Sequence, residues 1–217
     1  MYERLSKIDS LTCRDHHYLV DSDLCYYFGE YTARKGFDKS TTNQLIINFK
    51  KSVDRKGRVE YKYKLQAIDE IATLLNDHFV HTEKVTFIPV PPSKNRNDPL
   101  YDERIVSVLE KIKTLNDDVD YRDLIIQSET TEASHNSSNR LSPQEILKLY
   151  SFDELLVNNI RKHIFIFDDM LTTGSHFKAI QQLLLERFPE KKIYGIFVAR
   201  RALEAVDWDF DADIFEA

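Results

Sequence analysis

The stretch IFIFDDMLTTGSHF, from Ile164 to Phe177, decides the fold class of this chain. Its first four residues are apolar and are typical of a buried strand. Two acids, Asp168 and Asp169, follow directly, and a small, hydroxyl-rich turn over 172–175 then leads into a helical pattern. A buried strand that passes through such a turn into a helix indicates an α/β protein with a mostly parallel sheet.

The same alternation of strands and helices extends outward in both directions, from residue 64 to residue 201. This order predicts a doubly wound sheet with helices on both faces, in which ligands bind beyond the carboxyl ends of the strands. The apolar spacing and the turn residues predict strands over 84–91, 123–127, 163–169 and 192–201, and helices over 64–79, 105–115 and 175–188.

Three segments complete the predicted organisation. Residues 1–63 form a small N-terminal hood region, 64–201 the core, and 202–217 a C-terminal strand or tail. Within 1–63 we expect extended structure from His16, and a segment at 43–52 whose length does not decide between helix and strand. Residues 128–140 have no large apolar side chain and predict an exposed, mobile loop. Two capping boxes, at Ser142/Glu145 and Ser151/Glu154, predict that a helix begins at each.

The composition points to a water-soluble, cytoplasmic protein. No apolar run approaches the roughly 20 residues of a membrane span, and the polar N-terminus does not resemble a signal peptide. Cys13 and Cys25 fit no zinc spacing, so we interpret them as reduced thiols. The net charge of −6 argues against a nucleic-acid partner, although it does not exclude a local basic patch. The sequence does not decide whether the protein forms a homodimer.

The turn has the chemistry of a phosphate site. A helix that begins after Gly174 offers unpaired N–H groups and the positive end of its dipole. Thr172, Thr173 and Ser175 add hydroxyl donors, and Gly174 lets the backbone approach a ligand closely. The nearby acids would repel a phosphate that they touched, but they can accept hydrogen bonds from hydroxyls a few ångströms away. A ribose 5-phosphate supplies both groups.

The stretch resembles the motif with which type I phosphoribosyltransferases bind phosphoribosyl pyrophosphate (PRPP): an apolar strand, two acids, two spacers and T-T-G-x-[ST]. The resemblance implies that Asp168 and Asp169 hold the ribose hydroxyls and that residues 172–176 surround the 5′-phosphate. The family's last hydroxyl position is His176 here. A protonated histidine would replace that hydroxyl.

The segment FIPVPPSKNRND, residues 87–98, lies where the resemblance places the pyrophosphate loop. Lys94 and Arg96, with Arg104 beyond them, would then bind the diphosphate. Among subfamilies the chain is most similar to the competence protein F-like (ComF-like) phosphoribosyltransferases. That likeness rests on Pro89–Pro91, Asn139–Arg140 and Ala199–Arg200. The subfamily's zinc ribbon and its arginine-glycine-phenylalanine-asparagine-glutamine segment are missing.

The resemblance implies transfer of ribose 5-phosphate to a nitrogen acceptor, with release of pyrophosphate. Mg²⁺ would be held mainly by PRPP and water, with Asp168 and Asp169 as further ligands in some arrangements. Other hypotheses stay open at this point. They are a PRPP- or nucleotide-binding protein without turnover, a DNA-handling accessory protein, a metal site built directly on the two acids, and an acidic strand end with a solvated turn.

Overall fold

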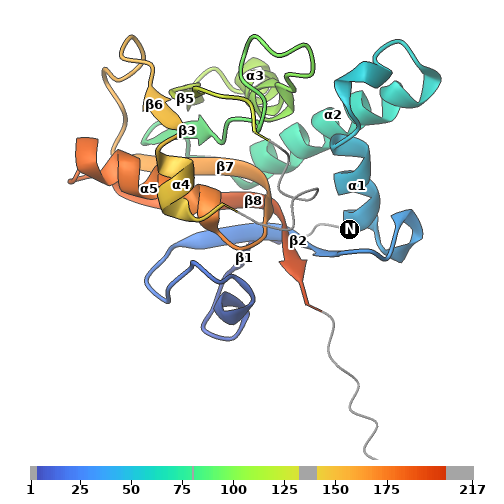
Figure 1. Cartoon of the computed structure of the whole chain (residues 1–217), viewed down its shortest axis with the longest axis horizontal. Coiled ribbons are helices and arrows are strands. Elements are labelled where there is room, and N and C mark those ends of the chain that lie inside the picture. Colours follow the sequence, from blue (N-terminus) through green and yellow to red (C-terminus); the bar gives the residue numbers. More distant parts are fainter. Residues whose placement is uncertain (1–3, 80, 132–140, 204–217) are drawn as a thin grey trace, which may run out of the picture.

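A computed structural model of the chain describes residues 4–79, 81–131 and 141–203. Its centre is a six-stranded sheet in the order β1-β2-β8-β7-β3-β4 (Figure 1). Only β1 runs antiparallel to its neighbour, so the sheet is mostly parallel as predicted. The strands are β1 Ser6–Lys7, β2 Cys25–Thr32, β3 Val85–Pro89, β4 Asp120–Tyr121, β7 His163–Leu171 and β8 Lys192–Ala202.

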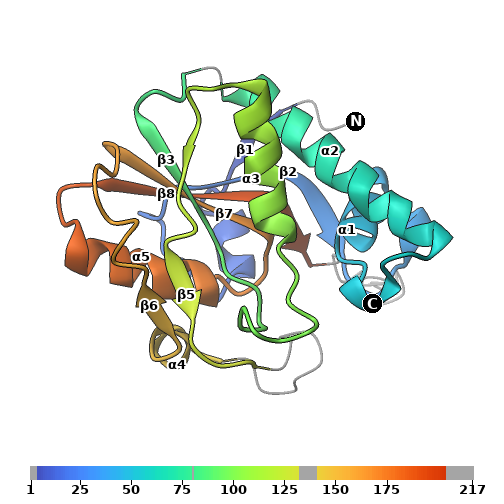
Figure 2. The same cartoon turned by 90° about the horizontal axis from the view of Figure 1, so that it is seen from above.

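Helices cover both faces of the sheet, as a doubly wound arrangement requires. Figure 2 shows α2 and α3 on one side and α5 on the other. Buried residues form two clusters that correspond to these faces, one around α1, α2 and α3 and one around α4 and α5. The helices are α1 Thr41–Phe49, α2 Lys62–His78, α3 Arg104–Leu115, α4 Pro143–Leu147 and α5 Ser175–Arg187, with 3₁₀ turns at Thr12–Asp15, Phe37–Lys39, Val53–Arg55 and Val59–Tyr61.

The chain reverses its winding direction between β3 and β7. From β3 it passes through α3 to β4 at one edge, whereas from β7 it passes through α5 to β8 on the other side. Because β3 and β7 are parallel neighbours, their carboxyl ends lie together. Loops leave this point in opposite directions, and in α/β sheets ligands bind at such a switch point. The predicted strand end at Asp168 lies beside it.

The predicted core strands and helices from 64 onward are confirmed to within a few residues. The strand predicted at 123–127 also forms, but it does not belong to the main sheet. This strand, β5 Ile125–Gln127, pairs antiparallel with β6 Tyr150–Phe152 in a separate two-stranded sheet. The sequence did not decide between helix and strand for the segment at 43–52, and most of it is helical as part of α1. At the start of this helix, the Asn43 side chain accepts a hydrogen bond from the backbone N–H of Thr32 and donates one to the Thr32 carbonyl.

One capping box is confirmed and the other prediction is wrong. Ser142 and Glu145 bond reciprocally at the start of α4, with Pro143 in the first turn. Ser151 instead lies inside β6, because pairing with β5 takes up its backbone. The box motif at Ser151 is therefore a chance spacing within a strand.

Residues before 64 contribute directly to the main sheet. β2 pairs in parallel with β8 along most of its length, and α1 packs against α2 within one buried cluster. Residues on both sides of the boundary expected at 63/64 thus belong to the same sheet. Of the C-terminal segment 202–217, only 202 and 203 lie within the described residues, and the predicted loop 128–140 is described only to residue 131.

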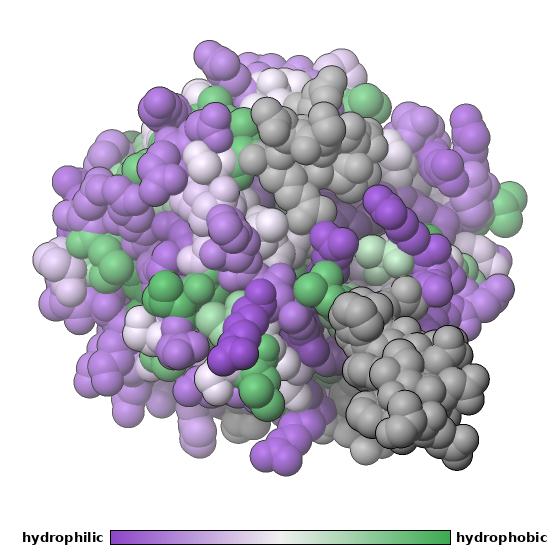
Figure 3. Space-filling model, turned by 60° about the horizontal axis from the view of Figure 1, so that its bottom comes forward, coloured by the Kyte–Doolittle hydropathy of each residue, from purple (hydrophilic) through white to green (hydrophobic). Residues whose placement is uncertain are grey.

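The surface drawn in Figure 3 is mainly hydrophilic, with hydrophobic residues scattered in small groups. Among the residues that the structure describes, no helix has both the length and the apolar composition that a membrane crossing requires.

Candidate functional site

The two acids at the end of β7 have different contacts within the protein. Both lie inside the strand, where successive side chains alternate. Ile164 and Ile166 belong to the buried cluster around α5, and Phe167 belongs to the cluster around α1 to α3. Asp169 joins the second set through its contacts with Lys50 and Arg104. The alternation ends there, because Met170 packs against the cluster around α1 to α3 and Leu171 belongs to the cluster around α5. The structure therefore gives different partners to two carboxylates that the sequence motif treats as a pair.

Asp169 is a buried counter-ion for two cations. It is 3% exposed. Its Oδ1 accepts a hydrogen bond from Lys50 Nζ at 2.9 Å, and its Oδ2 accepts from Arg104 Nε at 3.0 Å and Nη2 at 2.5 Å. Burial alone would raise the pKa of Asp169, but Lys50 and Arg104 outweigh it and lower that pKa below its ordinary value. Asp169 is thus anionic and fully occupied by protein partners.

The charge network continues from Arg104. Its Nη1 donates to Asp102 Oδ2 at 2.8 Å, and Lys64 Nζ donates to the same oxygen at 2.7 Å. Lys64 also donates to the backbone carbonyl of Lys51. These contacts connect the end of α1, the start of α2, the start of α3 and the end of β7.

The charges of Lys50 and Arg104 compensate Asp168 only in part. Its Oδ1 accepts a hydrogen bond from the backbone N–H of Asp169 at 2.7 Å, and within the described residues it forms no ion pair. Burial raises the pKa of Asp168 to about 7, and the negative charge of Asp169 adds to the shift. The remaining lone pairs of this half-buried carboxylate are available to hydroxyl donors.

The turn over 172–175 leads into α5 as predicted, and the helix start has no side-chain cap. The first N–H groups of α5 therefore have no partner within the helix. Thr173 Oγ1 and Ser175 Oγ lie 3.3 Å apart, so two hydroxyls gather at the same end. Uncapped N–H groups and hydroxyl donors together form an anion-binding arrangement beside Asp168.

Gly174 is required by the protein's own structure. Its φ of +83° lies in the left-handed region, which favours glycine. A Cβ there would meet Leu19 Cδ2 at 2.9 Å and Cγ at 3.1 Å. The turn conformation and the packing of Leu19 thus both require glycine, and the close approach of the backbone to a ligand stays a prediction.

His176 is neutral rather than protonated. Burial lowers the pKa of His176 to about 4, so the expected positive charge is absent near neutral pH. Its Nδ1 lies 2.7 Å from the hydroxyl of Tyr150, a side chain that is 6% exposed. The Tyr150 hydroxyl has no other acceptor in the described part of the chain, so it donates to Nδ1. His176 then carries its proton on Nε2, as a neutral donor in the first turn of α5.

The three cations expected to bind a diphosphate all have carboxylate partners within the chain. Arg96 Nη2 lies 2.5 Å from Asp123 Oδ2, and Lys94 Nζ lies 3.9 Å from Asp98 Oδ2. Arg104 holds Asp102 and Asp169, as described above. Lys94 and Arg96 do belong to the loop that follows β3, at the same edge of the sheet as Asp168. Their long, half-exposed side chains need to exchange partners before they bind a ligand.

Sequence reasoning missed Lys50, Tyr150 and His16, all of which contact the motif. The only available signal for Lys50 was the pair of lysines that follows the apolar run of α1. Neither Tyr150 nor His16 belongs to a sequence motif. A scan of the chain against protein-family models gives no match, and a comparison with curated proteins gives none either.

Proposed function

We propose that this protein binds PRPP at the carboxyl ends of β3 and β7 and transfers ribose 5-phosphate to a nitrogen acceptor of the nucleobase type. The observation that carries the proposal is the combination at the end of β7: a carboxylate without cationic partner, Asp168, next to an uncapped helix start with clustered hydroxyls. A ribose 5-phosphate matches it, because vicinal hydroxyls need acceptors and a phosphate needs donors.

In the reaction, a nitrogen of the acceptor forms a bond to C1 of the ribose while the bond from C1 to the diphosphate oxygen breaks. Pyrophosphate whose charge is neutralised is a good leaving group, so no side chain needs to supply a proton to it. The protein's contribution is then position and fixed charge. Asp168 orients the ribose, and the start of α5, with Ser175 and the Nε2–H of His176, holds the 5′-phosphate.

Mg²⁺ is the cofactor that the family resemblance implies, and the residues present fit it in one way. Within the described residues no group of three or more His, Cys, Asp or Glu side chains is placed to hold a metal ion. Asp169 is occupied by Lys50 and Arg104. Asp168 would therefore be the one acid beside the ion, and most ligands would be PRPP oxygens and water, as is usual for Mg²⁺ with phosphates. Bound there, Mg²⁺ would neutralise the diphosphate.

A second function, PRPP binding without turnover, is favoured by one specific observation. Lys94, Arg96 and Arg104 each pair with a carboxylate of the chain, so none of these three predicted diphosphate ligands is free in the described structure. A sensor that retains the ribose-phosphate half of the site needs none of these three side chains.

Pyrophosphate release separates the two functions. We expect the wild-type protein, with PRPP, Mg²⁺ and a mixture of purine and pyrimidine bases, to release pyrophosphate faster than without bases. A coupled pyrophosphate assay measures this, and a protein inactivated by Gly174→Val is the background. Base-independent rates together with measurable PRPP binding would contradict the transferase and favour the sensor. Absence of PRPP binding would contradict both.

A further inference from the structure

A segment near the N-terminus contacts the phosphate-binding turn from its outer side. Residues 16–19, here called the clamp segment, follow the first 3₁₀ turn and lie more than 150 positions from the turn in sequence. They make one contact with each of three successive turn residues. His16 bonds Thr172, the backbone of Tyr18 bonds Thr173, and Leu19 packs against Gly174.

The contact between His16 and Thr172 determines which nitrogen of the imidazole ring carries the proton. Nδ1 lies 2.5 Å from the carbonyl oxygen of Thr172. A carbonyl only accepts, so Nδ1 carries the proton and donates it. The side chain is 1% exposed, and burial lowers the pKa of His16, which keeps the ring neutral. Its Nε2 is then a buried lone pair, and it has no partner among the described residues. An unpaired polar atom costs stability, so a purely apolar packing role would be better served by leucine.

The clamp segment determines where the amides of the turn point. In a planar trans peptide the C=O and the following N–H project in opposite directions, and these peptide bonds are trans. His16 Nδ1 holds the carbonyl of Thr172, and the N–H of Tyr18 holds that of Thr173 at 2.9 Å. The N–H groups of Thr173 and Gly174 must therefore face away from the clamp segment, where the uncapped start of α5 begins.

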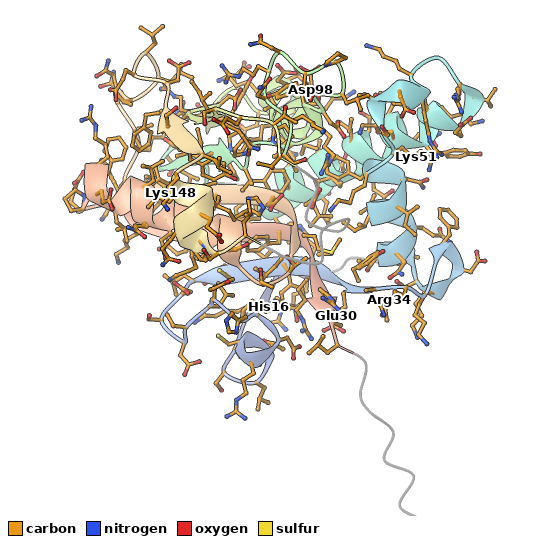
Figure 4. The ribbon with its side chains drawn as sticks, in the orientation of Figure 1. His16, Glu30, Arg34, Lys51, Asp98 and Lys148 are labelled. Carbon is orange, nitrogen blue, oxygen red and sulfur yellow. The ribbon has the colours of Figure 1, made fainter. Side chains whose placement is uncertain are left out.

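Ion pairs anchor the clamp segment on both sides. Before it, Asp15 Oδ2 accepts from Arg200 Nη1 at 2.7 Å, and Arg200 belongs to the end of β8. After it, Asp23 accepts from Lys178 Nζ of α5 at 2.8 and 3.0 Å. Figure 4 shows His16 in the coil beneath the sheet, apart from Asp98 in the loop after β3. The clamp segment is thus held next to the turn by ion pairs on both of its sides.

We propose that His16 is a positioning residue: by holding the Thr172 carbonyl outward, it orients the Thr173 and Gly174 amides toward the phosphate of the ligand. This inference rests on the proposed function for the identity of the ligand. It assigns a role to a segment that contributes no motif of its own.

Three variants of the full chain test this role. His16→Leu removes the donor and also removes the unpaired buried Nε2, so the fold should tolerate it. His16→Asn keeps a donor at nearly the same place, because the side-chain nitrogen of asparagine and the Nδ1 of histidine are both three bonds from Cα. His17→Leu is the matched control, since His17 is the exposed neighbour.

The readout is the amide of Gly174 itself. Gly174 is the only one of the five glycines that follows a threonine. Labelling with ¹³C-carbonyl threonine and ¹⁵N-glycine therefore gives one resonance in a carbonyl-selected spectrum. Without ligand we expect this resonance to move in His16→Leu and to stay near its wild-type position in His16→Asn and His17→Leu. Titration with Mg²⁺ and PRPP, and separately with inorganic phosphate, should show affinity about fivefold to tenfold weaker in His16→Leu alone.

The outcomes separate this inference from the proposed function. If the wild-type protein binds both ligands and His16→Leu binds them equally well with an unchanged Gly174 resonance, the positioning role is overturned and the proposed function stands. If His16→Asn behaves like His16→Leu, the hydrogen bond is not what matters and the role is again overturned. If the wild-type protein binds neither ligand, the proposed function fails, and the positioning role fails with it.

Discussion

Replacement of Asp169 by asparagine should destabilise the protein by about 3–5 kcal/mol, the usual cost of removing one partner from a buried ion pair. The change leaves Lys50 and Arg104 beside a neutral amide, and Arg104 retains only Asp102 as a counter-ion. For a chain of this length the loss corresponds to a fall in melting temperature of roughly 6–20 °C. Thermal unfolding at pH 7, followed by circular dichroism, measures it.

The pH dependence of this effect has a definite sign. The folded-state pKa of Asp169 is lowered by Lys50 and Arg104, against the effect of burial. Such a carboxylate contributes stability that is present above its unfolded pKa, near 4, and is lost as pH falls further. The difference between wild-type protein and Asp169→Asn should therefore be full at pH 6 to 7 and should shrink below pH 4.

The matched control is the same substitution one residue earlier. Asp168 has a folded pKa raised to about 7, mainly by burial. Its contribution to stability is present below the unfolded pKa and is lost as pH rises through 7, because the buried charge is unfavourable. Asp168→Asn should therefore raise the melting temperature, and by more at pH 8 than at pH 5. Equal destabilisation by both substitutions would contradict the separation of the two acids.

Asp168→Asn should also lower the affinity for PRPP by about tenfold to a hundredfold, the range expected when a hydrogen bond to a charged acceptor is lost. The ribose hydroxyls would lose the ionised carboxylate, while the turn and the start of α5 stay intact. Affinity for inorganic phosphate, which has no hydroxyl for Asp168 to hold, should stay the same or increase because a negative charge has gone. Calorimetric titrations of both ligands measure the two effects.

The comparison of ligands makes this result specific. Because Asp168→Asn is expected to be at least as stable as the wild-type protein, a loss of PRPP affinity does not reflect unfolding. Equal losses for PRPP and for inorganic phosphate would contradict the assignment of Asp168 to the ribose, because the defect would then lie in the phosphate part of the site.

The strand-turn-helix motif could be predicted from sequence because its determinants are local. The apolar run of β7, the turn at 172–175 and the amphipathic pattern of α5 lie within a few residues of one another. The capping box at Ser142 is local for the same reason. The box at Ser151 shows the limit of such signals, since pairing between β5 and β6 overrides it.

The environment of the acids could not be predicted, because it depends on contacts between distant segments. Lys50 and Asp169 are 119 positions apart, and His16 and Thr172 are 156 positions apart. Adjacent acids look equivalent in a motif, yet Asp169 forms ion pairs with Lys50 and Arg104, whereas Asp168 forms none within the described residues. The packing of Leu19 against Gly174 is another contact between distant segments that no local motif shows.

The most direct test of the account is a calorimetric titration of the ligand-free wild-type protein with PRPP in the presence of Mg²⁺, set beside a titration with Mg²⁺ alone. We predict stoichiometric binding of PRPP with Mg²⁺. Mg²⁺ alone should bind weakly, because Asp169 is occupied by Lys50 and Arg104 and Asp168 is a single carboxylate. Tight binding of Mg²⁺ without PRPP, or no binding of PRPP at all, would contradict a ribose-phosphate site at the end of β7.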